Sequence, residues 1–299
     1  MEWLLYGLTL LAAPLVPGWI NKVKAAMAGR RGPPLLQLYR DVWKLARKET
    51  VETTELSVVG RWAPVVLAAT GVVALAVLPI GNRSVIAFPG DFIALVYVLV
   101  LGRLLLVLAA LDTGSSFQGM GASRELLIAA LAEPAFLLGL TVLVIGTHEL
   151  TLSGIFTNSL PYVDTAAIPA LILAGVVFLL VALAENARIP FDDPNTHLEL
   201  TMIHEVMVLD YSGVQLALVL YGGALKLVLF CGLLGRLILP LPVGGDAANA
   251  ASAALGILLV ATLIGLVESL TARIRMMRIS HMLGTATAFA VLALLLTLS

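Results

Sequence analysis

The chain has 299 residues, of which 60% are hydrophobic and only 12% are charged, and its mean hydropathy is +1.01. Soluble domains carry about 25% charged residues, so this composition excludes an ordinary soluble domain and predicts an integral membrane protein. A net charge of −1 argues against a nucleic-acid partner. The single cysteine, Cys231, can form neither an internal disulfide nor a metal cluster, so any redox cofactor is expected on another chain.

The first apolar segment, "MEWLLYGLTLLAAPLVPGWINKVK", differs from a cleaved signal peptide in its charge order. Glu2 is its only early charge, and its lysines follow the apolar run instead of preceding it. This order predicts a retained first helix whose N-terminus lies outside the cell.

Long apolar runs recur along the whole chain. A hydrocarbon core about 30 Å thick needs roughly 20 apolar residues as helix, and the runs show no alternation typical of a barrel. The sequence therefore predicts an all-α, polytopic protein with one membrane domain over residues 1–299. The eight predicted spans are residues 3–20, 62–80, 91–111, 125–146, 166–184, 214–236, 253–272 and 281–298.

The basic residues are distributed unequally between the two ends of the predicted bundle. Fourteen of the eighteen lie in the first, third, fifth and seventh loops, whereas the opposite side holds only Arg83 and Arg236. Because basic loops stay in the cytoplasm, the odd loops are predicted to be cytoplasmic and both termini to lie outside.

The first cytoplasmic loop, residues 21–61, contains a predicted amphipathic helix in "PPLLQLYRDVWKLARKE". One helical stripe is apolar, and the basic residues fall away from it. The stripe consists of Leu35, Leu38, Tyr39, Val42, Trp43 and Ala46. Such a helix can dock partner subunits or lie on anionic lipid, and the two interpretations are compatible.

Several ionisable residues fall within the predicted spans or at their ends: Arg103, Glu133, Glu185, Lys226 and Glu268. Charges inside a membrane are costly and are functional candidates by default. They can form a polar relay for protons, or they can be structural ion pairs and snorkelling side chains. Glu133 is the strongest candidate, because Pro134 frees backbone groups beside it that can hold water.

The fifth loop, residues 185–213, contains the densest titratable segment, "ARIPFDDPNTHLELTMIHEVMVLDYSG". Its prolines oppose an early helix start, and Thr196 with Glu199 matches a capping box. A short capped helix that ends near Asp210 is therefore predicted.

The two histidines of this loop, His197 and His204, do not have the spacing of a metal site. Seven residues of helix separate them by roughly 10 Å, and His204-Glu205 lacks the second histidine of a zinc motif. No nucleophile or phosphate-binding loop is evident, so bond-breaking chemistry is not expected in this chain. Proton handling with partner docking is the favoured interpretation, and a solvated acidic loop is the alternative.

Three separated motifs give the chain a family resemblance. The fifth-loop segment "ENARIPFDDP" with "YSG" after it resembles the signature of the H/1-type membrane subunit of respiratory complex I. "GASRELLIAALAEP" resembles that family's third loop and fourth helix, where an arginine precedes a membrane glutamate by nine residues, as Arg124 precedes Glu133. "RRGPPLLQLYRDVWKLARKE" resembles its first-loop amphipathic helix. The resemblance covers essentially the whole chain.

The segment after Pro194 distinguishes two branches of this family. The complex I type continues with a densely acidic run, whereas this chain has "NTHLELTMIH". The segment resembles the homologous subunit of group 4 [NiFe] hydrogenases of the formate hydrogenlyase and hydrogenase-4 type, which favours a hydrogenase over a quinone reductase. The resemblance implies a membrane anchor without a cofactor of its own, with the [NiFe] centre and iron–sulfur clusters in partner subunits. The implied partners are the hydrogenase large and small subunits, a ferredoxin-like iron–sulfur subunit and antiporter-like membrane subunits.

The resemblance and the residues together assign two groups of site residues. The proton pathway and coupling group consists of Arg103, Glu133, Glu185, Asp192, Glu199, Lys226 and Glu268. The partner-docking group consists of Arg124, Arg188, His197, His204, Glu205 and Asp210.

We expect a non-catalytic coupling subunit of an energy-converting [NiFe] hydrogenase in a bacterial or archaeal cytoplasmic membrane. Two alternatives remain open. The first is the quinone-chamber subunit of a complex I-like NADH:quinone oxidoreductase. The second is a stand-alone transporter, against which the partner-type loops argue.

Overall fold

The structure, a computed structural model, describes residues 1–51, 57–156, 167–192, 202–240 and 245–298. These residues form helices and no strands, which confirms the predicted fold class. The helices are α1 (Glu2–Ala12), α2 (Leu15–Met27), α3 (Gln37–Ala46), α4 (Val58–Val77), α5 (Asp91–Asp112), α6 (Ser116–Thr147), α7 (Leu152–Gly154), α8 (Ile168–Glu185), α9 (His204–Met207), α10 (Gly213–Ile238), α11 (Asp246–Leu270) and α12 (Met276–Leu298).

Seven described helices are long and apolar enough to cross a membrane, and the bent pair α1 and α2 makes up to eight. The predicted first span, residues 3–20, is therefore not one continuous helix. The chain bends by 48° between α1 and α2, and α2 continues to Met27. Pro14 stands at the break, where its missing N–H and its ring prevent a regular helix from continuing.

Helix α6 is longer than its predicted span, residues 125–146. It begins at Ser116 and contains 32 residues, which correspond to about 48 Å of helix, more than the roughly 30 Å of hydrocarbon. The extra turns lie at the N-terminal end, before Glu125. Glu125 is therefore an interior residue of the helix and not the first residue of a span.

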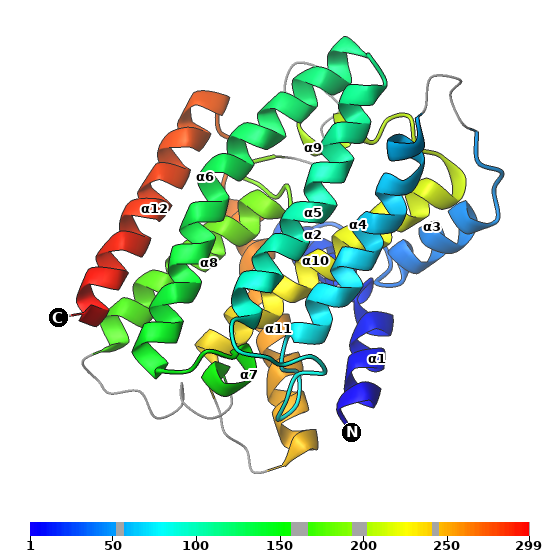
Figure 1. The fold of residues 1–299 in the computed structure, drawn as a ribbon. Coiled ribbons are helices and arrows are strands. Elements are labelled where there is room, and N and C mark those ends of the chain that lie inside the picture. Colours follow the sequence, from blue (N-terminus) through cyan, green and yellow to red (C-terminus); the bar gives the residue numbers. More distant parts are fainter. Residues whose placement is uncertain (52–56, 157–166, 193–201, 241–244, 299) are drawn as a thin grey trace.

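The bundle has two distinct ends, which Figure 1 shows. The N- and C-termini and the short helix α7 lie at one end, and the loops that carry α3 and α9 lie at the opposite end. The first, third, fifth and seventh loops lie at this second end, as predicted from the distribution of the basic residues. The side of the membrane that each end faces stays a prediction.

Helix α10 runs through the centre of the bundle and packs against α2, α3, α4, α8 and α11. Its close approach to α4 depends on Gly222, where an added Cβ would lie 3.3 Å from the backbone of Ala68. Because α10 is so enclosed, any polar side chain that it directs inward must find a partner from another helix.

The predicted amphipathic helix of the first loop is present as α3, which packs against α10 and α2. The Tyr39 hydroxyl donates a hydrogen bond to the carbonyl of Leu11. Trp43 is 62% exposed, and the guanidinium of Arg47 lies 4.3 Å from its ring centroid. The helix thus presents an aromatic and basic surface to a partner or to lipid headgroups, and both interpretations stay open.

In the described part of the fifth loop, one short helix is present, α9 (His204–Met207), which lies within the C-terminal part of the predicted helix. Met202 and Ile203 before it are not helical, and α9 ends before Asp210. The predicted cap residues Thr196 and Glu199 lie outside the described residues.

Candidate functional site

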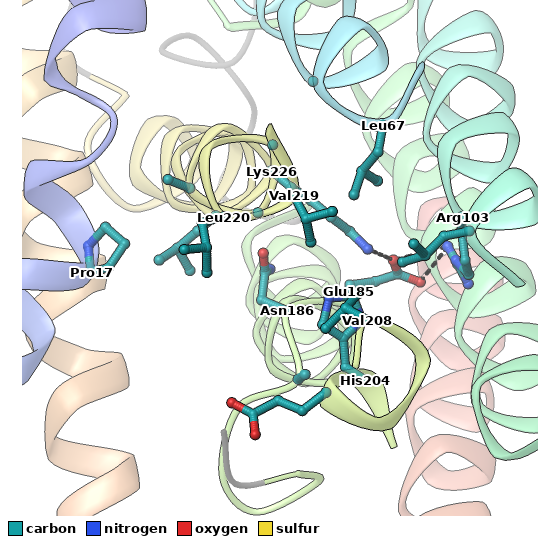
Figure 2. A pocket seen from close by; sticks show the side chains of 18 of the residues that line it. Pro17, Leu67, Arg103, Glu185, Asn186, His204, Val208, Val219, Leu220 and Lys226 are labelled. Atoms are coloured by element: carbon teal, nitrogen blue, oxygen red, sulfur yellow. Dashed lines mark hydrogen bonds and ion pairs between the residues drawn. The ribbon is translucent and has the colours of Figure 1, made fainter. Parts of the chain in front are cut away.

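Four helices each direct one charged side chain to a common point inside the bundle: α5 with Arg103, α6 with Glu133, α8 with Glu185 and α10 with Lys226. Arg103 Nη2 lies 2.8 Å from Glu185 Oε1 and 2.9 Å from Glu185 Oε2. Arg103 Nη1 lies 3.1 Å from Glu133 Oε1, and Lys226 Nζ lies 2.7 Å from Glu185 Oε2. Figure 2 shows Glu185 between the two cations. We call these four residues the intramembrane cluster.

The four predictions for this cluster came from separate spans, and the structure joins them through direct contacts. Arg103 is 7% exposed and Glu185 is 9% exposed, so both charged side chains are largely removed from solvent. A single buried charge in hydrocarbon costs several kcal/mol, and pairing it with an opposite charge offsets much of that cost. The cluster therefore joins four helices to one another through ion pairs inside the bundle.

A second group of ion pairs lies at the loop end of the bundle. Glu268 contacts Lys24 at 2.6 Å and Arg188 at 3.2 Å. Arg273 lies 2.8 Å from Asp192. These contacts join the fifth loop to α2, to the end of α11 and to the seventh loop. Glu268 and Asp192, both predicted pathway residues, thus pair within this second group and not with Arg103.

A cavity of about 540 Å³ lies between α10, α4 and the fifth loop. Its apolar lining residues are mostly leucine and valine, and its polar residues come from six helices and the fifth loop. The charged and titratable residues that line it are Arg103, Glu125, Glu185, Arg188, Asp192, His204, Glu205, Tyr211 and Lys226. The cavity therefore connects the fifth loop with the intramembrane cluster. Glu133, Glu268, Arg124 and Asp210 do not line it.

His204 is placed in the cavity wall by two features of α9. Its backbone N–H donates to Asp192 Oδ2 at 3.2 Å, and Val206 and Met207 anchor the short helix in the core. Burial, together with the positive charges of Lys226 and Arg103, lowers the pKa of His204 to about 4, although the carboxylate of Asp192 acts in the opposite direction. At neutral pH His204 is therefore a neutral imidazole, which can donate and accept a hydrogen bond inside the cavity.

The remaining predicted docking residues lie around the fifth loop. Arg124 Nη1 donates to the carbonyl of Met202 at 3.0 Å, which ties α6 to the loop. Asp210 is partly exposed between α9 and α10. His197 and Glu199 lie outside the described residues, so the structure gives their predictions no test.

Two residues of the site were not predicted. Glu125 is 7% exposed and lines the cavity. It was not selected from the sequence because the predicted fourth span begins at this residue, so it stood at the end of a span and not inside one. Tyr211 donates its hydroxyl to the carbonyl of Gly60 at 2.9 Å, and burial raises its pKa to about 12. The neighbouring pair Arg124-Glu125, with opposite charges on an apolar helix, was the available sequence signal for Glu125.

No group of three or more histidine, cysteine, aspartate or glutamate side chains in the described part of the chain could hold a metal ion. The site consists of carboxylates paired with cations beside a mostly apolar cavity.

Fold and site together define a polytopic membrane protein in which a loop-side cavity borders a buried group of charges. The NADH dehydrogenase family matches residues 2–298, so the chain belongs to this family. Hydrogenase-4 component C of Escherichia coli is 33% identical over 294 residues, 95% of this chain and 91% of that protein. Formate hydrogenlyase subunit 4 of the same organism is 32% identical over 225 residues, 75% and 72% of the two chains.

A complex I relative is more distant. A subunit of the NADH-quinone oxidoreductase of Novosphingobium aromaticivorans is 30% identical over 249 residues, 76% of this chain and 70% of that protein. Among solved structures, a chain of the membrane-bound sulfane sulfur reductase, an archaeal respiratory membrane complex, superposes with a TM-score of 0.83 at 19% identity and covers 99% of both chains. The family resemblance inferred from the sequence is therefore confirmed, and the chain is a membrane subunit of a complex I-like or hydrogenase-type assembly.

Proposed function

We propose that this chain is the membrane anchor and coupling subunit of an energy-converting [NiFe] hydrogenase of the formate hydrogenlyase or hydrogenase-4 type. It links electron transfer in a peripheral arm to translocation of protons or sodium ions. The [NiFe] centre and the iron–sulfur clusters belong to the partner subunits, and this chain contributes no cofactor.

One observation carries the coupling role. Arg103 lines the cavity beside the fifth loop and also binds Glu133, which lies outside the cavity. A change in charge or hydration on the fifth-loop side therefore changes the electrostatic environment of Arg103. Through its ion pair with Arg103, the carboxylate of Glu133 in α6 is affected in turn. This arrangement supports transmission of a redox event at the loops into the membrane.

The fifth loop supports the docking part of the proposal. Ion pairs of Asp192 with Arg273 and of Arg188 with Glu268 hold the described part of this loop against the bundle. The first loop adds the exposed aromatic and basic surface of α3. These surfaces suit the hydrogenase large and small subunits and the ferredoxin-like subunit, and the flanks of the bundle suit the antiporter-like subunits. The complex would lie in a bacterial or archaeal cytoplasmic membrane, with both termini of this chain outside.

The coupling role is tested with Glu133→Gln in the purified complex reconstituted into liposomes. We expect hydrogen evolution to persist while the number of ions translocated per electron falls by at least about tenfold, because the amide cannot bind and release a proton. Glu149→Gln is the matched control, since it changes the same residue type beyond the other end of α6. Wild-type ion translocation per electron in Glu133→Gln would refute the role.

A second candidate function is supported by the cavity itself. Its volume of about 540 Å³ and its apolar walls with a few polar groups are typical of a pocket for an amphipathic small molecule. This is consistent with the relative from Novosphingobium aromaticivorans, which is named as part of an NADH-quinone oxidoreductase. Photo-crosslinking of a quinone analogue to residues 204–227 in the purified complex would favour that function, and co-purification of a [NiFe] large subunit would favour the first.

A further inference from the structure

Helix α12 lies at the edge of the bundle and has two different faces (Figure 1). It packs against α6 and α8. The residues that it buries are Ile279, Leu283, Ala286, Ala290 and Ala293. Exposed residues recur along the helix between them: Arg278, His281, Thr285, Phe289 and Leu292. Because successive members of this second set are three or four residues apart, they share one face of α12. That face is basic at the loop end and apolar within the span.

Two exposed arginines, Arg275 and Arg278, form the basic end of this face. The backbone N–H of Arg278 donates to the carbonyl of Arg275 at 2.9 Å, so the two residues are one helical turn apart. Within the part of the chain that the structure describes, neither side chain has a hydrogen bond or an ion pair. Side chains one turn apart start about 5–6 Å from each other. This spacing suits a phosphate group between them, because a guanidinium binds phosphate oxygens through paired N–H donors.

The ion pairs next to this face already hold more cations than carboxylates. Their carboxylates are Glu268 and Asp192, both buried. Their cations are Lys24, Arg188 and Arg273. Among the described residues, these pairs therefore leave one positive charge in excess, and the two exposed arginines add two more. An anion bound at the arginines would reduce this excess, whereas the buried carboxylates are engaged elsewhere.

The apolar part of the same face indicates which anion fits. Phe289 is 39% exposed and Leu292 is 46% exposed, and Leu270 and Met277 are 75% and 79% exposed beside the arginines. Arg278 and Phe289 are eleven residues apart, which is about 16 Å of helix and about half of the 30 Å hydrocarbon core. A soluble anion or an acidic protein loop would use only the basic end. A phospholipid uses both parts, with its headgroup at the loop end and its acyl chains along the span.

We propose that α12 and the seventh loop bind an anionic phospholipid. Its phosphate lies between Arg275 and Arg278, and its acyl chains lie along Phe289 and Leu292. A zwitterionic lipid would bring a further cation towards the arginines, so the site selects headgroups with a net negative charge. None of these four residues lines the cavity or belongs to the intramembrane cluster. The lipid site therefore goes beyond the proposed coupling function and is independent of it.

The headgroup part is tested by native mass spectrometry of the intact purified complex, titrated with phosphatidylglycerol and with phosphatidylcholine of the same acyl chains. Each basic residue near a membrane strengthens the binding of anionic lipid about fivefold. Arg275→Gln/Arg278→Gln should therefore bind phosphatidylglycerol about 25-fold more weakly than the wild type and phosphatidylcholine almost equally. The control Arg30→Gln/Arg31→Gln removes two exposed arginines of the first loop and should keep the wild-type preference. An unchanged preference in the first double variant, or an equal loss in both, would overturn the proposal.

The acyl-chain part is tested by photo-crosslinking in the intact complex. Phe289→p-benzoylphenylalanine, irradiated in nanodiscs that contain phosphatidylglycerol, should give an adduct with phospholipid. A cross-link to another protein subunit instead would show that this face of α12 is a protein interface, and the proposal would fail. Glycerol phosphate, which has the phosphate but no acyl chains, should not displace bound phosphatidylglycerol at equal concentration. If it does, the arginines form a site for a soluble anion and the assignment to a lipid is wrong.

Discussion

The ion pair between Asp192 and Arg273 gives a quantitative prediction about the fifth loop. Its atoms lie 2.8 Å apart, and the two side chains are 5% and 20% exposed. Hydrogen bonds to charged groups contribute about 1.5–3 kcal/mol, and partial exposure of the arginine places this pair near the lower half of that range. Arg273→Met should therefore weaken the attachment of the loop by about 2 kcal/mol.

That loss of free energy is measurable by hydrogen exchange. Because 1.4 kcal/mol corresponds to a factor of ten, amides of residues 202–210 should exchange about 30-fold faster in Arg273→Met than in the wild-type complex. Asp192→Ala should have a larger effect, since it also removes the acceptor of the His204 backbone N–H. The assay is hydrogen-exchange mass spectrometry on the intact complex, with the spans as internal references.

Arg275→Met is the matched control, because Arg275 is an exposed arginine of the same loop. It should change exchange in residues 202–210 by less than about threefold, as expected for a surface substitution within about 0.5 kcal/mol. Equal exchange rates in Arg273→Met and Arg275→Met would show that the pair does not hold the fifth loop, and the reasoning would be refuted.

Two further predictions concern stability. Arg236 is 3% exposed and donates to the carbonyls of residues 79, 80 and 81 at 2.8–3.1 Å. Arg236→Met should therefore lower the free energy of unfolding by about 3 kcal/mol and the thermal unfolding midpoint by about 6 °C. Arg83→Met, at an exposed arginine, should leave the midpoint unchanged, and equal midpoints in the two variants would contradict the prediction. Because the pKa of His204 is about 4 when folded, the unfolded chain binds more protons below pH 6.5, so stability falls as the pH is lowered from 6.5 towards 4. Between pH 7 and pH 5 the free energy of unfolding of the wild type should fall by about 2 kcal/mol through this residue, and His204→Gln should lack this contribution. If the thermal midpoints of the wild type and of His204→Gln depend equally on pH, His204 is excluded as its source.

The helical bundle was predictable because each span must satisfy its own backbone in hydrocarbon, so hydropathy along the chain reveals it directly. The break at Pro14 was missed because the span was predicted from hydropathy, which does not register that a proline interrupts the helix. The start of α6 at Ser116 was missed because its first turns extend past the apolar run. Glu125 was overlooked for the same reason, and it proved to be a cavity residue.

The candidate site divides in a similar way. The sequence identified Arg103, Glu133, Glu185 and Lys226 one at a time, because any charge in a span is conspicuous. It did not show that Glu185 accepts from both cations or that Glu268 pairs with Lys24 instead, since these contacts join residues 41 to 244 positions apart. The identity of a partner depends on how the helices rotate and pack, and a pattern in one helix carries no information about the next.

The sequence by itself determined that the chain crosses a membrane, which loops share an end of the bundle, and to which family it belongs. These properties follow from local hydropathy, from the distribution of basic residues and from contiguous motifs. The tertiary structure alone decided which charges meet and that several of them line a common cavity. Pairing is a property of side chains brought together from different helices, so only their packing in three dimensions could fix it.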